Sequence, residues 1–188
     1  LETIRSVTAL PIAVDANQGW KDKHYALDMI HWLKEKGIVM IEQPMPKEQL
    51  DDIAWVTGQS PLPIFADESL QRLADVAALK GAFTGINIKL MKCGGITNAL
   101  RIASAAEVYG VECMIGCMLE AKISVNAAVE LACAKKIITK VDLDGPVLCS
   151  EDHILGGAVF DEKNITVSDA PGMGIRGFVP GKVTYLDD

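Results

Sequence analysis

Ionisable side chains stand at the ends of several short apolar runs in this chain. Four of them fall at comparable places and could meet at one site: Asp15, Glu42, Asp67 and Lys89. A fifth run ends with two carboxylates, Asp142 and Asp144. A buried strand that stops on a charged group is costly unless a partner satisfies that group. We therefore expect the fold to bring these side chains together.

Three of these side chains are carboxylates, which indicates a metal site. Asp15, Glu42 and Asp67 would repel one another at short range unless a cation lay among them. Oxygen ligands without histidine or cysteine favour Mg²⁺ or Mn²⁺ over zinc. The alternative is that each acid only caps the helix that follows it. Three acids at matched positions favour the metal site.

Lys89 is the candidate for acid/base chemistry because it ends the next apolar run. A lysine near a divalent cation, in a partly desolvated pocket, gives up its proton more readily and can act as a base. The alternative is a structural salt bridge to Asp67 or Glu68. Lys92 is a rival lysine, but it is predicted in the loop after the strand.

Asp142 and Asp144 form a pair with a different expected role. They alternate along the chain, so they are predicted to share one face of a strand. Two fixed carboxylates on one face suit the capture of an ammonium group. The alternative is a pair of solvated loop residues.

Strands and helices alternate along the chain with a regular period. Six strands are predicted, at residues 10–14, 38–41, 64–66, 86–88, 112–115 and 137–141. Residues 1–9 resemble the end of a helix, and helices are predicted at 23–36, 48–56, 72–79, 96–109 and 124–134. This alternation predicts parallel β/α units, in a doubly wound open sheet or a (β/α)8 barrel. Polar residues at the C-terminal ends of the strands favour the barrel, whose active sites lie on that face.

A barrel of this type has eight strands, and this chain supplies about six. Six parallel strands with two unpaired edges would invite aggregation. We therefore expect a segment of a longer protein, with residues 1–157 forming strands three to eight of the barrel. Residues 158–188 are predicted to be an extension, with a hairpin at 158–160 and 164–167. It would pack outside the barrel or on a capping domain that precedes this chain.

Composition and charge argue against several function classes. The chain has 188 residues, of which 49% are hydrophobic, and a net charge of −7 without a dense basic run. Nucleic acid and anionic membranes are therefore poor partners, and no apolar run approaches the roughly 20 residues of a membrane span. Five cysteines without a metal-ligand spacing predict reduced thiols and a cytoplasmic protein. A homo-oligomer is compatible with these features.

Five short motifs together resemble the enolase superfamily, in its muconate-lactonising-enzyme subgroup. They are Asp15-Ala-Asn17, Glu42-Gln-Pro44, Ala66-Asp-Glu-Ser69, Ile88-Lys-Leu-Met-Lys-Cys-Gly-Gly95 and Pro171-Gly-Met-Gly-Ile175. The resemblance implies that one Mg²⁺ ion is bound by three carboxylates, those of Asp15, Glu42 and Asp67. It also implies that three further residues lie around these ligands: Asn17, Glu68 and Lys92. It implies that Lys89 is an acid/base on one face of a substrate α-carbon, beside an enediolate that the metal stabilises.

Within that subgroup, Asp142-Leu-Asp144 is similar to the corresponding segment of the dipeptide epimerases. The resemblance implies that this pair binds the α-ammonium of a dipeptide substrate and that Met118 and Leu119 line its peptide bond. The implied reaction is a Mg²⁺-dependent epimerisation by 1,1-proton transfer at the α-carbon of the C-terminal residue, which makes the protein an isomerase. The family's second lysine and its capping domain would precede Leu1, so this chain alone is expected to be inactive.

Several other functions remain open on the same scaffold. They are N-acylamino acid racemase, o-succinylbenzoate synthase and muconate-type cycloisomerase. These alternatives lack a substrate ammonium for the acidic pair to bind. A structural barrel subunit without catalysis is the alternative from another class, and an intact set of metal ligands together with Lys89 argues against it.

Overall fold

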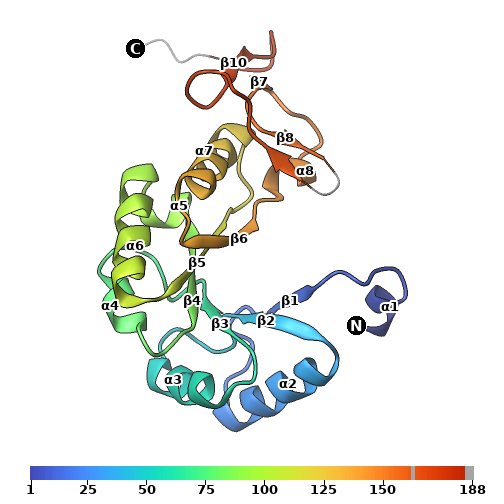
Figure 1. The fold of residues 1–188 in the computed structure, drawn as a ribbon. Coiled ribbons are helices and arrows are strands. Elements are labelled where there is room, and N and C mark those ends of the chain that lie inside the picture. Colours follow the sequence, from blue (N-terminus) through green and yellow to red (C-terminus); the bar gives the residue numbers. More distant parts are fainter. Residues whose placement is uncertain (162–163, 185–188) are drawn as a thin grey trace.

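A parallel six-stranded sheet forms the centre of the computed structural model, which describes residues 1–161 and 164–184 (Figure 1). Its strands are β1 (Ile12–Asp15), β2 (Ile38–Glu42), β3 (Ile64–Ala66), β4 (Gly85–Lys89), β5 (Glu112–Gly116) and β6 (Ile138–Asp142). They lie side by side in chain order, and each neighbouring pair is parallel. The six predicted strands are confirmed to within two residues.

The sheet curves into an open arc whose gap lies between β1 and β6 (Figure 1). A doubly wound sheet would reverse its strand order at a switch point, whereas here the order runs from β1 to β6 without reversal. Right-handed crossovers in one direction curl such a sheet toward closure, as in a barrel. The predicted barrel architecture is therefore confirmed, with about six of its eight strands in this chain.

The longer helices connect successive strands and lie on the outside of the arc (Figure 1). They are α2 (Lys23–Glu35), α3 (Leu50–Gln59), α4 (Asp75–Leu79), α6 (Ile96–Tyr109) and α7 (Lys122–Ala134). Shorter turns are α1 (Glu2–Arg5), α5 (Leu90–Cys93) and α8 (Gly145–Leu148). None of the described helices is long and apolar enough to cross a bilayer.

Three local predictions differ from the structure. Residues 1–9 contain only the single turn α1. The helix predicted at 72–79 begins at Asp75, because the Asp75 carboxylate accepts hydrogen bonds from the backbone N–H groups of Gln71 and Arg72, each at 2.9 Å, and holds both in a turn. Lys92 lies in α5 and not in a loop, since the chain forms one helical turn directly after β4, which Gly94 ends with a φ of 83°.

The apolar core lies on both faces of the sheet. On the outer face, strand residues such as Ile64 and Ile86 are completely buried against the helices. On the inner face, Met40, Phe65 and Met114 form a separate cluster. Gly85 also faces this inner cluster, and a Cβ at this position would overlap the Phe65 ring. Met40 and Phe65 stand two residues before Glu42 and Asp67, so they share the face that carries the charged strand ends.

After α8 the chain leaves the sheet and forms two antiparallel pairs. They are β8 (Val159–Phe160) with β9 (Ile165–Thr166), and β7 (Ile154–Gly156) with β10 (Ile175–Phe178). The first pair confirms the predicted hairpin, and β10 was missed because Pro171 to Ile175 indicated only a turn. The boundary at residue 157 stays a prediction. Residues 162–163 and 185–188 of the extension lie outside the described residues.

Asn126 of α7 attaches this C-terminal part to the barrel. Its Nδ2 donates to the Met173 carbonyl oxygen at 2.8 Å, and its Oδ1 accepts from the backbone N–H of Ala158. The Asn126 side chain is completely buried, and both hydrogen-bonding ends of its amide are used. Asn126 therefore acts here as a structural tie between α7 and the tail.

Candidate active site

The structure brings the three predicted carboxylates together at the C-terminal ends of β1, β2 and β3. One carboxylate oxygen from each of Asp15, Glu42 and Asp67 lies within 4.8 Å of the other two. Glu42 and Asp67 are buried, with 5% and 6% of their surface exposed, whereas Asp15 is exposed on the edge strand. Strand register explains this meeting: Asp15 pairs with Glu42, and Phe65, two residues before Asp67, pairs with Glu42 from the other side.

Electrostatics within this cluster favour a bound cation. Burial, together with the charges of Asp15 and Asp67, raises the pKa of Glu42 to about 7, although a hydrogen bond from Asn87 acts in the opposite direction. Loss of water also raises the pKa of Asp15, and the charge of Asp67 adds to this. The donor set consists of three oxygens, which fits a hard divalent cation such as Mg²⁺. These three residues could hold such an ion.

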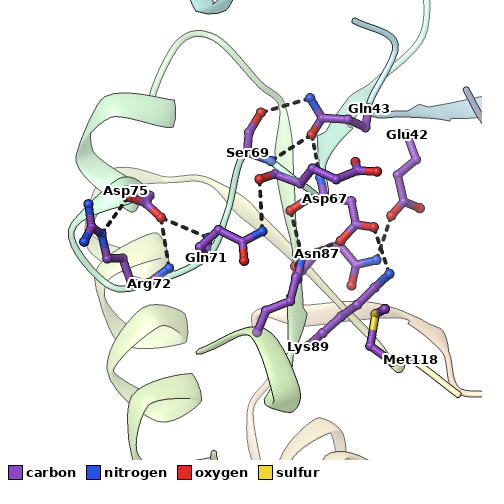
Figure 2. A network of polar contacts seen from close by, with 12 residues as sticks. Glu42, Gln43, Asp67, Ser69, Gln71, Arg72, Asp75, Asn87, Lys89 and Met118 are labelled. Atoms are coloured by element: carbon purple, nitrogen blue, oxygen red, sulfur yellow. Dashed lines mark hydrogen bonds and ion pairs between the residues drawn. The ribbon is translucent and has the colours of Figure 1, made fainter. Parts of the chain in front are cut away.

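Two lysines, Lys89 and Lys92, share Asp67, and Figure 2 shows the contact of Lys89 with it. Lys89 Nζ donates to Asp67 Oδ2 at 2.8 Å. Lys92 Nζ donates to Asp67 Oδ1, to the Asp67 carbonyl oxygen at 2.6 Å and to the Asn87 carbonyl oxygen at 3.2 Å. An ammonium group has three N–H donors, so Lys92 uses all of them within the protein. Lys89 has one described acceptor and keeps donors for another group.

The two lysines also differ in their pKa values. Burial acts to lower the pKa of Lys89, but the hydrogen bond and the charge of Asp67 raise it overall. This differs from the expected easily lost proton, because Asp67 holds the ammonium form. Burial lowers the pKa of Lys92 despite its contact with Asp67. The pKa of Asp67, which burial alone would raise, is lowered by Lys92 and Lys89.

Gln43, which the sequence analysis did not select, connects two of the carboxylate-bearing strand ends (Figure 2). Its Nε2 donates to the Met45 carbonyl oxygen at 3.0 Å and to Ser69 Oγ at 2.9 Å. Its Oε1 accepts from the backbone N–H groups of Asp67 at 2.9 Å and Ser69 at 3.1 Å. This completely buried amide therefore sets the spacing between Glu42 and Asp67. The sequence feature that could have indicated Gln43 is its position directly after Glu42.

Asn17 contacts the Asp15 carboxylate and Glu68 follows Asp67 in the chain, and the roles implied for both beside a metal ion stay predictions. Asn17 adopts a left-handed backbone conformation with a φ of 45°, and its N–H donates to Asp15 Oδ1 at 2.8 Å. This turn orients the Asp15 carboxylate. Glu68 is half-buried, and its Oε2 has no hydrogen-bond partner among the described residues.

Asp142 and Asp144 do not share one strand face as the alternation predicted. Strand β6 ends at Asp142, and Asp144 takes a helical conformation just before α8, because Pro146 at the start of α8 favours that turn. Asp142 lines a cleft of about 470 Å³ between β1 and β6, together with Asp15 and Glu42. Burial and the charge of Asp144 raise the pKa of Asp142, so the two carboxylates still interact.

Met118 and Leu119 lie in the loop that follows β5 and are open to contact. Their exposed fractions are 48% and 81%. The loop is held by Glu120, which is buried and accepts a hydrogen bond from the Met118 N–H at 2.8 Å. The side chain of Glu120 also accepts from the Ser124 hydroxyl at the start of α7.

Known proteins that are similar to this chain in sequence and in fold identify its family. Residues 1–177 match the family model described as Enolase C-terminal domain-like. The L-Ala-D/L-Glu epimerase of Bacteroides thetaiotaomicron is 65% identical over 175 residues, which are 93% of this chain and 45% of that protein. A substrate-liganded complex of the L-Ala-D/L-Glu epimerase from Bacillus subtilis superposes with a TM-score of 0.88 at 37% identity, over 94% of this chain and 50% of that one.

A third protein of this kind has been solved with ligands. The dipeptide epimerase from Enterococcus faecalis V583, complexed with Mg and the dipeptide L-Leu-L-Tyr, gives a TM-score of 0.87 at 39% identity. It covers 93% of this chain, which in turn covers 51% of it. This chain therefore spans about half the length of the proteins it resembles. The match over residues 1–177 and the curved parallel sheet show that the chain belongs to the Enolase C-terminal domain-like family.

Proposed function

We propose that the protein carrying this chain is a Mg²⁺-dependent isomerase that epimerises a dipeptide by 1,1-proton transfer. The observation that carries this proposal is the meeting of three carboxylates, one of which accepts a hydrogen bond from Lys89. Two of these carboxylates, Asp15 and Glu42, line a cleft together with Asp142. The similarity to dipeptide epimerases, including one complexed with Mg and a dipeptide, supports the choice of substrate.

Asp15, Glu42 and Asp67 would hold the Mg²⁺ ion. When bound, the ion supplies positive charge that stabilises the negative charge developing on the substrate's carboxylate and competes with the lysines for Asp67. Gln43 and Asn17 keep these carboxylates at a fixed spacing through the hydrogen bonds described above. These contacts would hold the three ligands close together before an ion binds, while Asp67 would have to give up a lysine contact to bind it.

Lys89 Nζ is the atom proposed to take the α-proton of the C-terminal residue, and it must do so as the neutral amine although Asp67 favours its ammonium form, which raises its pKa. The bond between the α-carbon and hydrogen breaks, its electron pair stays with the substrate, and a new N–H bond forms. When the reaction starts from the other epimer, the Lys89 ammonium gives a proton to this same face. Lys92 is excluded from this role because its three donors are engaged with Asp67 and Asn87. One lysine reaches one face of the α-carbon, so epimerisation also needs a proton donor on the opposite face.

Asp142 is proposed to bind the free α-ammonium of the dipeptide, with Asp144 adding negative charge nearby. Asp142 lines the same cleft as Asp15 and Glu42, which supports a role at the amino end of a substrate whose carboxylate lies near the metal ligands. Met118 and Leu119 are proposed to lie against the peptide bond. Such an acidic pair would favour dipeptides over N-acylated amino acids, which have no ammonium group to bind.

Exchange of the α-proton tests this function directly. The full-length protein is incubated in D₂O with a library of dipeptides and of N-succinyl amino acids, with Mg²⁺ or with excess EDTA, and loss of the α-proton signal is followed by NMR. We expect exchange of dipeptides that requires Mg²⁺ and that Glu42→Gln abolishes. Glu107→Gln, on the exposed face of α6, is the matched control and should exchange like the wild type.

Two outcomes would contradict the proposal. Full exchange in excess EDTA would remove the metal from the reaction. Turnover of N-succinyl amino acids without any dipeptide exchange would replace the epimerase by an N-acylamino acid racemase on the same scaffold.

The cytoplasmic location and a homo-oligomeric state remain expectations, and the same preparation can report the oligomeric state by light scattering.

A further inference from the structure

Asn87 is a completely buried polar residue on the inner face of the sheet that the chemistry above does not use. It lies on β4 two residues before Lys89. Side chains two residues apart in a strand point to the same face, so Asn87 stands directly below Lys89. Its neighbour across the ladder is Met114 of the inner apolar cluster. An apolar side chain would therefore suit this position better than an amide if packing alone mattered.

The two ends of the Asn87 amide have different surroundings. Nδ2 reaches across β3 and donates to Glu42 Oε1 at 2.7 Å (Figure 2). Oδ1 is buried but has no hydrogen-bond partner among the described residues. An unpaired buried carbonyl oxygen destabilises the fold, whereas a leucine of similar size would avoid that cost. The hydrogen bond to Glu42 is therefore the contact that accounts for an asparagine here.

Gly116 on the neighbouring strand β5 leaves space for this amide. A Cβ at position 116 would come within 2.8 Å of Asn87 Oδ1 and 2.9 Å of Asn87 Nδ2. The same Cβ would lie 3.1 Å from Lys89 Cε. The missing side chain at Gly116 therefore leaves room for the Asn87 amide and the Lys89 side chain beside each other.

We propose that Asn87 is a positioning residue that fixes the rotation of the Glu42 carboxylate and so presents this ligand to the metal ion. The inference rests on the proposed function, because it assumes that Glu42 binds Mg²⁺. A carboxylate held by a donor on one oxygen has fewer orientations to lose when the ion binds. Contacts of this kind behind a metal ligand typically contribute about ten- to a hundredfold in metal affinity.

The test compares metal affinity in two buried asparagine variants. Mg²⁺ binding to the full-length protein is measured by titration calorimetry, and Mn²⁺ binding by electron paramagnetic resonance. Asn87→Leu should raise the metal Kd by about ten- to a hundredfold. Asn126→Leu is the matched control, because Asn126 is equally buried but, among the described residues, its side chain bonds to the backbone of Met173 and Ala158 and to no metal ligand. It should lose stability and keep the wild-type Kd.

Asn87→Ser is the second variant, because it removes the long amide without adding bulk and remains informative where leucine prevents folding. It should weaken metal binding in the same direction. A folded Asn87 variant with the wild-type Kd would overturn the positioning role and leave the metal site standing. Equal weakening in Asn126→Leu would also overturn it, since the effect would then follow from packing in general. A wild-type protein that binds neither ion would remove the proposed function and this inference together.

Discussion

Replacing Lys92 by methionine should destabilise the metal-free protein far more than removing an exposed ion pair does. The side chain of Lys92 is 12% exposed and that of its partner Asp67 is 9% exposed, and three hydrogen bonds hold the ammonium group. Methionine keeps the apolar stem of the side chain, so the loss reports the charge. Breaking a buried pair typically costs about 3–5 kcal/mol because one charge is left uncompensated.

The structure places the expected value near the lower end of that range. Asp67 keeps its hydrogen bond from Lys89 at 2.8 Å, so its charge is not left without a partner. We therefore expect Lys92→Met to reduce the free energy of unfolding by about 3 kcal/mol. The Asn87 carbonyl oxygen also loses a donor, which contributes to the loss.

Urea unfolding of the full-length protein in EDTA, followed by circular dichroism, measures this change. Lys23→Met is the control, because Lys23 Nζ lies 2.7 Å from Asp52 Oδ1 with side chains that are 35% and 38% exposed. Exposed pairs of this kind contribute about 0.2–1 kcal/mol. Mg²⁺ should stabilise Lys92→Met more than wild type, because the ion no longer competes with that ammonium group for Asp67. Equal losses of unfolding free energy in the two variants would refute the reasoning that burial makes the Lys92–Asp67 pair more stabilising than an exposed pair.

Further predictions concern the reaction, the packing and the pH response. Lys89→Ala should block α-proton exchange from one epimer far more than from the other, and NMR in D₂O with each epimer separately decides this. Asp142→Asn should lower kcat/KM for dipeptides about ten- to a hundredfold, as expected for one lost charge-assisted contact, while calorimetry shows an unchanged Mg²⁺ Kd. Gly85→Ala should lower the free energy of unfolding, measured in urea, by about 1–3 kcal/mol, because its Cβ overlaps the buried Phe65 ring. Gly58→Ala in α3 is the control, and it should be neutral or slightly stabilising because there is open space around Gly58. Glu42 has a folded pKa of about 7 against 4.5 when unfolded, so the folded state binds more protons between these values and stability in EDTA should fall by on the order of 3 kcal/mol as pH rises from about 4.5 to 7. Glu42→Gln should flatten that slope, and an unchanged slope in urea titrations across this range would argue against the raised pKa.

The amino-acid sequence by itself determined the framework of the site. Each apolar run is short and ends on a charged residue or a turn residue. Because these end signals are carried by neighbouring residues in the chain, the strands could be placed to within two residues. The period of the β/α units then puts every strand's C-terminal end on one side of the sheet. That is why the meeting of Asp15, Glu42 and Asp67 followed from the spacing alone.

Side-chain partners across the sheet were decided only by the tertiary structure. Lys92 and Lys89 both converge on Asp67 because a helical turn follows β4. The sequence favoured Lys89 as the residue that ends the strand, but it did not predict that Lys92 binds the same carboxylate. Asn87 stands out in the sequence as a polar residue in an apolar run, but its partner Glu42 lies 45 residues away across another strand. Such pairs depend on register and strand order, which no local pattern encodes.

The path of the backbone after β6 was likewise decided by the tertiary structure and not by the local sequence. Alternation of Asp142 and Asp144 predicted one continuous strand face, and period-two alternation does hold for residues that stay in a strand. The chain instead turns after Asp142, because Gly145 and Pro146 begin α8, and Leu143 is buried in the core. Burial of that leucine and closure of the turn depend on packing against neighbouring elements. The sequence therefore located the acidic pair, and only the folded structure decided that one of the two carboxylates faces the cleft with Glu42.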